Sequence, residues 1–178
     1  MRIHDLPPGF DDPVEALLGF HRRIERQLAA LCGLPGSIES RGMDAEMSAA
    51  AGTAIEFFSN LVATHQADEE DLMPLLEMRL ASGERDAVRG LAARLQSEHR
   101  EMDRVWRVLR RPLESVAAGI NRGLPGDLLQ YYRSLQATHI GLEEGGIHQR
   151  AVRCLLSADR AALGRGMVAR RTRKHRFA

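Results

Sequence analysis

The chain has 178 residues, the size of one ordinary domain that is long enough to bury a full hydrophobic core. Hydrophobic residues make up 44% of the chain and aromatic residues 4%, and the formal net charge is +1, so the overall charge does not favour a nucleic-acid partner. No apolar run is long enough to cross a membrane, and Cys32 and Cys154 form no C-x-x-C pair, which argues against a thiolate zinc site or a disulfide scaffold and favours reduced thiols.

The first predicted helix starts at Asp11-Asp12-Pro13, because an aspartate cap followed by proline in the first turn is typical of a helix start. From Val14 onward, apolar residues recur at steps of three and four positions, which predicts an amphipathic helix with His21 on its apolar face. The turn-forming run Gly33-Leu34-Pro35-Gly36-Ser37 should end this helix.

The second predicted helix begins near Asp44 and carries His65 and Glu69 in its apolar seam. A glutamate does not belong in an apolar seam without a partner, so Glu69 indicates a site rather than simple packing. Pro74 should bend or break the helix, and Ser82-Gly83 should close the segment.

A third helix is predicted from about Glu84, where apolar residues again recur at steps of three and four positions. His99 lies in the same seam as these apolar residues. Pro112 should disturb this helix near its end.

The fourth predicted helix follows a cluster of turn-forming residues that ends at Asp127. It places His139 inward, with Glu143 beside the apolar stripe. Gly145-Gly146 should weaken its end, because glycine is a poor helix former.

A short last helix is expected from about Asp159, and it leads into a basic tail, Arg170 to Arg176, which we expect to be a disordered, solvated end.

No alternating pattern predicts a strand, so the fold class is all-α. Four long amphipathic helices favour an antiparallel up-down four-helix bundle with a short extra C-terminal helix. We assign residues 1–160 to the bundle and residues 161–178 to the helix end and tail.

The motif His-x-x-x-Glu occurs twice in nearly the same sequence, from His65 to Glu69 and from His139 to Glu143. In an α-helix, a residue four positions on lies about 6 Å further along the same face. Each pair therefore offers an imidazole nitrogen and a carboxylate to one point in space.

The seam histidines of the other two helices, His21 and His99, enlarge this set. An antiparallel bundle would bring four imidazoles and two carboxylates to a similar depth, and a structural core has no reason to carry so many buried polar groups. The set is suited to binding two metal ions.

Three further carboxylates lie close to the predicted ligands. Glu25 and Asp103 follow His21 and His99 by four positions, and Asp68 leans toward the same face as its neighbour Glu69. Each could bind a metal or accept a hydrogen bond from an imidazole. We expect Glu25 and Asp68 to lie in solvent, whereas Asp103 is equally suited to a role in the site and to a solvated helix flank.

Glu70 and Glu144 should point about 140° away from the preceding histidines and lie in solvent. Tyr132 lies two turns before His139 and either donates a hydrogen bond near the site or packs in the core. Three histidines fall outside the pattern, namely His4, His148 and His175.

Over about residues 12–156, the sequence resembles the hemerythrin-like family, also called the HHE cation-binding domain. The residues that carry the resemblance are His21, the run His65-Gln66-Ala67-Asp68-Glu69-Glu70 with Leu72, Pro74 and Leu75, then Glu98-His99, and His139 with Glu143-Glu144. The resemblance implies an up-down four-helix bundle around two iron ions, bridged by the two glutamates and an oxo or hydroxo group and capped by the histidines. Zinc and manganese remain alternatives, because imidazole and carboxylate do not select iron strictly.

The sequence departs from the oxygen-carrying members that it resembles at two points. Those members have a fifth histidine four positions after the third-helix histidine, where this chain has Asp103. The run Gly145-Gly146-Ile147-His148 replaces a proline-containing ending, so the fourth helix is expected to be irregular there.

The resemblance implies a non-haem di-iron protein that senses or reacts with small oxidants such as oxygen, peroxide or nitric oxide, or that handles iron under stress. The alternatives are a peroxide-consuming di-iron enzyme and a module that binds oxygen or stores iron, with the tail contacting a partner. We expect a cytoplasmic, bacterial-type monomer or homodimer whose ligand is a diatomic molecule or a peroxide.

Overall fold

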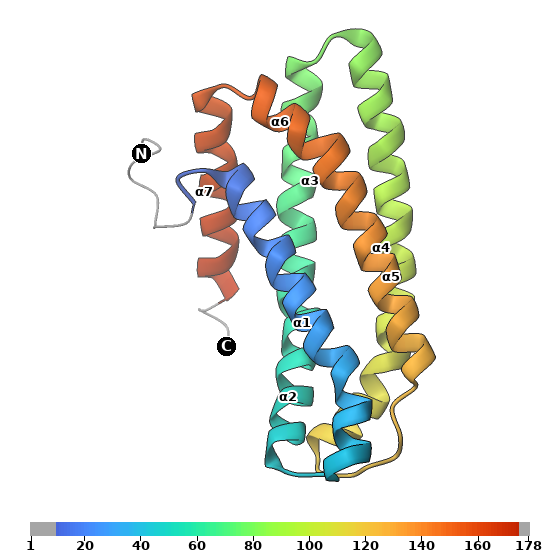
Figure 1. Cartoon of the computed structure of the whole chain (residues 1–178). Coiled ribbons are helices and arrows are strands. Elements are labelled where there is room, and N and C mark those ends of the chain that lie inside the picture. Colours follow the sequence, from blue (N-terminus) through green and yellow to red (C-terminus); the bar gives the residue numbers. More distant parts are fainter. Residues whose placement is uncertain (1–9, 175–178) are drawn as a thin grey trace. The chain divides into compact units, whose positions relative to one another are not determined.

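The computed structural model describes residues 10–174, and all regular secondary structure in this part of the chain is helical (Figure 1). The α-helices are α1 (Pro13–Arg41), α2 (Ala45–Glu56), α3 (Val62–Arg79), α4 (Ser82–Ala117), α5 (Gly126–Leu142), α6 (Gln149–Cys154) and α7 (Ser157–Lys174). Two π-helices, η2 (Phe57–Leu61) and η3 (Glu143–His148), lie between α-helical segments. The prediction of an all-α fold class is confirmed.

Helix α1 begins where the sequence predicts, because the Asp12 carboxylate accepts hydrogen bonds from the Val14 and Glu15 amides at 3.1 and 3.2 Å. The prediction that Gly33–Ser37 ends this helix is wrong, since α1 runs through Pro35 to Arg41. Apolar side chains on both sides of Pro35 are buried, and their burial outweighs the poor helix propensity of this run. The helix ends at Arg41 and is followed by Gly42, whose φ of 80° suits glycine.

The other two helix prolines do not end their helices either. Pro74 lies inside α3 and Pro112 inside α4. Of the two predicted effects of Pro74, a bend or a break, the break does not occur, and again the neighbouring residues Leu72 and Leu76 are fully buried. A proline in a helix removes one backbone hydrogen bond, and the buried apolar face compensates for it here.

The described chain divides into two compact units, each built from separate stretches of sequence. The first unit contains the described residues up to His21, Thr64–Leu95 and the described residues from Gly141 onward. The second unit contains Arg22–Ala63 and Gln96–Ile140. Helices α1 and α4 therefore contribute residues to both units.

The first unit has a core of aliphatic side chains drawn from all of its helices. Its buried members are Val14, Leu17, Leu72, Leu76, Leu80, Val88, Leu95, Ile147, Ala151, Leu155, Leu163 and Met167. Since burying an aliphatic side chain of this size contributes roughly 1.5–3 kcal/mol, this core gives the unit a rigid base for polar residues.

The core of the second unit contains an aromatic cluster. The Phe58 ring lies 5.1 Å from that of Trp106 and 5.6 Å from that of Tyr132, measured between centroids. The hydroxyl of Tyr132 accepts a hydrogen bond from Gln136 Nε2 at 3.0 Å. Of the two roles predicted for Tyr132, these contacts are those of core packing.

Helix α7 is longer than the short helix that the sequence predicts, and the expected boundary at residue 160 falls inside it. Leu163 and Met167 belong to the core of the first unit, while Arg170 and Arg171 both bind the carboxylate of Asp68. The expectation of a solvated tail is wrong for these two arginines. The side chains after Thr172, and with them His175, lie outside the described residues, as does His4.

Two predictions about the chain as a whole can be checked in the described residues. None of the described helices has the length and apolar character needed to cross a membrane. Cys32 and Cys154 are both free thiols, as predicted.

Candidate metal centre

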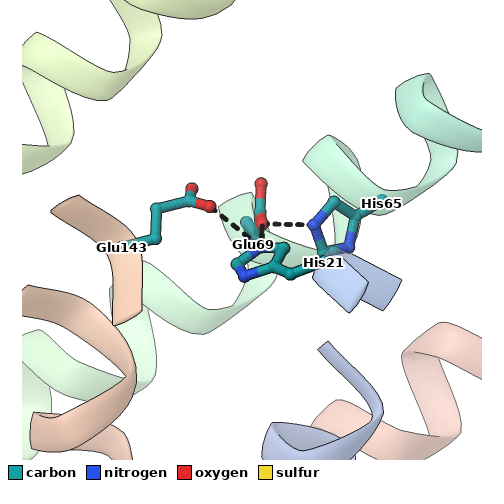
Figure 2. A group of neighbouring side chains, drawn as sticks. All are labelled: His21, His65, Glu69 and Glu143. Atoms are coloured by element: carbon teal, nitrogen blue, oxygen red, sulfur yellow. Dashed lines mark hydrogen bonds and ion pairs between the residues drawn. The ribbon is translucent and has the colours of Figure 1, made fainter. Parts of the chain in front are cut away.

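Four candidate ligand residues converge in the first unit, and three helical segments supply them. His21 comes from α1, His65 and Glu69 lie one turn apart on α3, and Glu143 is the first residue of η3 (Figure 2). One nitrogen or oxygen atom from each lies within 4.8 Å of the corresponding atoms of the others. All four residues are between 1% and 3% exposed, so the cluster is screened from bulk water.

The distances within this cluster are those of polar groups crowded around a common point. His65 Nε2 lies 2.7 Å from Glu69 Oε1, and His21 Nε2 lies 3.1 Å from Glu143 Oε2 and 3.4 Å from Glu69 Oε1. Neither nitrogen of His65 makes a hydrogen bond. The close approach of His65 Nε2 to Glu69 Oε1 therefore does not have the angles that a hydrogen bond requires. Crowded imidazole and carboxylate groups are stabilised when a cation lies among them.

The orientation of His21 shows why the cluster requires positive charge. Its Nδ1 donates a hydrogen bond to Glu144 Oε1 at 3.1 Å, because an ionised carboxylate can only accept. Its Nε2 therefore faces Glu69 and Glu143. A lone pair on Nε2 would repel two carboxylate oxygens unless a proton or a metal ion lies between them.

The pKa values follow the same logic. Burial alone would lower the pKa of His21, but hydrogen bonds and charge interactions with Glu143 and Glu69 outweigh burial and raise it to about 10. Burial alone would raise the pKa of Glu69, but the charge interaction with His65 and the hydrogen bond and charge interaction with His21 hold it well below its usual range. The cluster thus favours ionised carboxylates around a cation.

His148 also lies against this cluster, although the sequence analysis left it out. It is 2% exposed, its ring centroid lies 5.1 Å from that of His21, and neither ring nitrogen has a hydrogen-bond partner. Burial, and then the positive charge of His21, lower its pKa to about 4, so the ring is neutral near pH 7. The sequence analysis assumed α-helical spacing, in which residues four positions apart share a face, and that spacing does not bring His148 to the site. In a π-helix the hydrogen bonds link positions five residues apart, and Glu143 and His148 are five apart here.

The other two predicted histidine ligands pair with each other in the second unit. His99 Nε2 and His139 Nε2 are 2.8 Å apart, and His139 Nδ1 lies 3.1 Å from Glu98 Oε2. Since the Glu98 carboxylate accepts the Nδ1 proton, the Nε2 lone pair of His139 faces His99. This arrangement, with a carboxylate behind an imidazole, is common around metal ligands.

The remaining candidate carboxylates have separate positions. Asp103 is exposed and belongs to none of the ligand groups found in the described residues, and Glu25 is exposed as expected. Asp68 is not in solvent as predicted, because it is fully buried and binds Arg170 and Arg171. The expectation for Glu144 is also wrong, since the π-helical turn lets it reach His21 while its side chain stays 43% exposed.

The donor set of the first unit fits a metal cation. Two imidazoles and two carboxylates are ligands for iron, zinc and manganese alike. The Glu144 carboxylate binds Nδ1 of His21 and so fixes the orientation of the ring. This leaves Nε2 as the nitrogen that can give its lone pair to a metal ion, which is the arrangement that a metal-binding histidine needs.

Comparisons with known proteins agree with this donor set. The chain is 24% identical over 163 residues to an uncharacterized protein of Haemophilus influenzae, and the match covers 91% of each chain. Residues 12–151, which include every residue of the cluster, match the family described as the hemerythrin HHE cation binding domain. The chain therefore belongs to the hemerythrin HHE cation-binding domain family.

Proposed function

We propose that this protein binds two non-haem iron ions and uses them to sense or react with a small oxidant, such as oxygen, peroxide or nitric oxide, or to handle iron under stress. The observation that carries the proposal is the position of His21 Nε2, which faces Glu143 and Glu69 at 3.1 and 3.4 Å inside a buried cluster. A buried group of this kind needs a compensating positive charge, and the match to a cation-binding family favours a metal ion over a proton on His21. Bound iron would supply the electron transfer that these side chains cannot perform.

In this proposal, His21, His65, Glu69 and Glu143 are the ligands in the first unit, and His99 and His139 bind the second ion. The second ion and the antiparallel four-helix arrangement rest on the repeated His-x-x-x-Glu motif and on family membership. Iron is chosen over zinc and manganese for the same reason.

The protein's own residues orient the ligands and restrict access to them. Glu144 holds the His21 ring, and the Phe20 ring stacks on His65 with centroids 4.5 Å apart. Because all four ligands are buried, only a small molecule can reach them. This size limit supports a diatomic molecule or a peroxide as the reactant.

The test is the visible absorption of protein purified without oxygen, whose iron content is measured before it is mixed separately with oxygen, hydrogen peroxide and nitric oxide. We expect bound iron and new absorption bands with at least one of these molecules. Zinc-loaded protein is the control, since zinc has no redox chemistry. An iron-loaded protein whose spectrum none of the three changes would contradict the oxidant function, and sustained peroxide turnover would make it an enzyme.

A further inference from the structure

The side chain of His148 is buried among metal-ligand candidates without a hydrogen-bond partner for either nitrogen. Leaving a buried polar group unpaired is costly, because the group has lost its hydrogen bonds to water. Such a group usually has a partner that is not protein, namely a water or an ion. Its nearest ring neighbour is His21, whose Nε2 faces the two carboxylates of the cluster.

The local backbone holds His148 in this position. In η3, which spans Glu143–His148, the hydrogen bonds link positions five residues apart instead of four. At Gly146 this segment lies so close to α4 that a Cβ atom would collide with Leu91 Cδ2. Glycine at this position therefore permits the turn that brings His148 beside Glu143.

We propose that His148 is a further ligand of the metal ion bound by His21, His65, Glu69 and Glu143. This inference rests on the proposed function, because it requires that the cluster bind a metal. It gives the first unit three imidazoles in place of the two that the sequence pattern predicts. The third imidazole, that of His148, comes from η3. Asp103, which stands where the oxygen-carrying members have their additional histidine, is exposed.

To bind the ion, the His148 ring would turn away from its stacked position on His21. The ring now stacks on His21 at an interplanar angle of 23°, so it lies beside the four converging ligand atoms and not among them. The torsion about the Cβ–Cγ bond of histidine is broad and has no deep staggered wells. A turn of the ring would give the unpaired nitrogen a partner and complete the donor set.

The test compares His148→Phe with the unmodified protein, using cobalt(II) as the probe metal. Phenylalanine keeps a planar ring against His21 and removes both nitrogens. We expect cobalt affinity, measured by competition with a chelator, to fall at least about tenfold, and X-ray absorption to count one imidazole fewer. Ile147→Val is the matched control, because it trims a buried side chain of the same segment without removing a ligand atom, and its affinity and imidazole count should not change.

Two failures can be told apart in this experiment. If His148→Phe binds cobalt as tightly as the unmodified protein and with the same imidazole count, His148 only stacks or holds a water, and the inference is overturned while the proposed function stands. If the unmodified protein binds no cobalt and no iron, both fail. His148→Leu, checked for helical content by circular dichroism, should repeat the loss and guards against a folding defect specific to phenylalanine.

Discussion

At the scale of single residues, His21 determines how the cluster can be used. Its Nδ1 is fixed by the half-exposed carboxylate of Glu144, and its Nε2 faces the buried carboxylates of Glu69 and Glu143. A hydrogen bond to one imidazole nitrogen sets which nitrogen can bind a metal and raises its basicity. In the proposed function, Glu144 therefore contributes to metal binding by holding His21 and is not itself a ligand.

Replacing Glu144 by alanine should weaken metal affinity by about 10–100-fold, which is the usual effect of removing a hydrogen-bond partner of a metal-binding histidine. Glu70→Ala is the matched control, because Glu70 holds the same place in the other Glu-Glu pair but is exposed. Iron(II) competition titrations without oxygen measure both variants. Equal losses in the two variants would show that lost surface charge, and not the His21 hydrogen bond, is responsible.

The residues that the sequence could predict are those whose geometry follows from the α-helix alone. His65 and Glu69 lie one turn apart because they are four positions apart in α3. Glu144 and His148 could not be placed this way, because their positions depend on the π-helical turn. Asp68 was misplaced for a different reason, since its burial depends on two arginines from a distant helix, α7.

At the scale of helices, α7 is attached to α3 at both of its ends. Near its start, Asp159 accepts two hydrogen bonds from Arg79, at 2.8 and 2.9 Å, and one from the Leu156 amide at 2.9 Å. Near its end, Arg170 and Arg171 bind Asp68, the residue before the predicted ligand Glu69. These contacts make α7 part of the first unit and support the helix that carries two of the proposed ligands, His65 and Glu69.

The Asp159 contact predicts a specific dependence of stability on pH. Its hydrogen bonds with Arg79 lower the pKa of Asp159 in the folded protein below its value in the unfolded chain, which is near 3.9. The contribution is therefore complete above about pH 5 and disappears as the pH falls through the folded pKa. Asp159→Asn should melt a few degrees lower at pH 7, and its difference from the unmodified protein should shrink below about pH 4.

Thermal unfolding of chelator-treated protein at several pH values measures this difference in melting temperature. Asp86→Asn serves as the control, because Asp86 is 77% exposed and lies 3.7 Å from Arg89, so its replacement should have little effect at any pH. An Asp159→Asn difference that stays constant from pH 7 to about pH 3 would contradict the assigned role of the ion pair.

At the scale of the whole molecule, periodic apolar residues were enough to predict an all-helical chain. Helix ends were predicted less well, because Pro35, Pro74 and Pro112 all lie inside helices whose neighbouring apolar residues are buried. Local propensity does not include that burial energy. The two compact units were not predicted either, because each combines stretches that are distant in sequence.

In the proposed function the buried residues of the first unit bind metal, and the metal content of the purified protein tests this most directly. Protein purified without oxygen should contain about two metal ions per chain, mostly iron. The double variant Glu69→Ala, Glu143→Ala should lose most of this metal, because it removes both carboxylates that face His21. The exposed pair Glu25→Ala, Glu70→Ala is the control and should keep it. Full metal occupancy in the Glu69→Ala, Glu143→Ala variant would contradict the account.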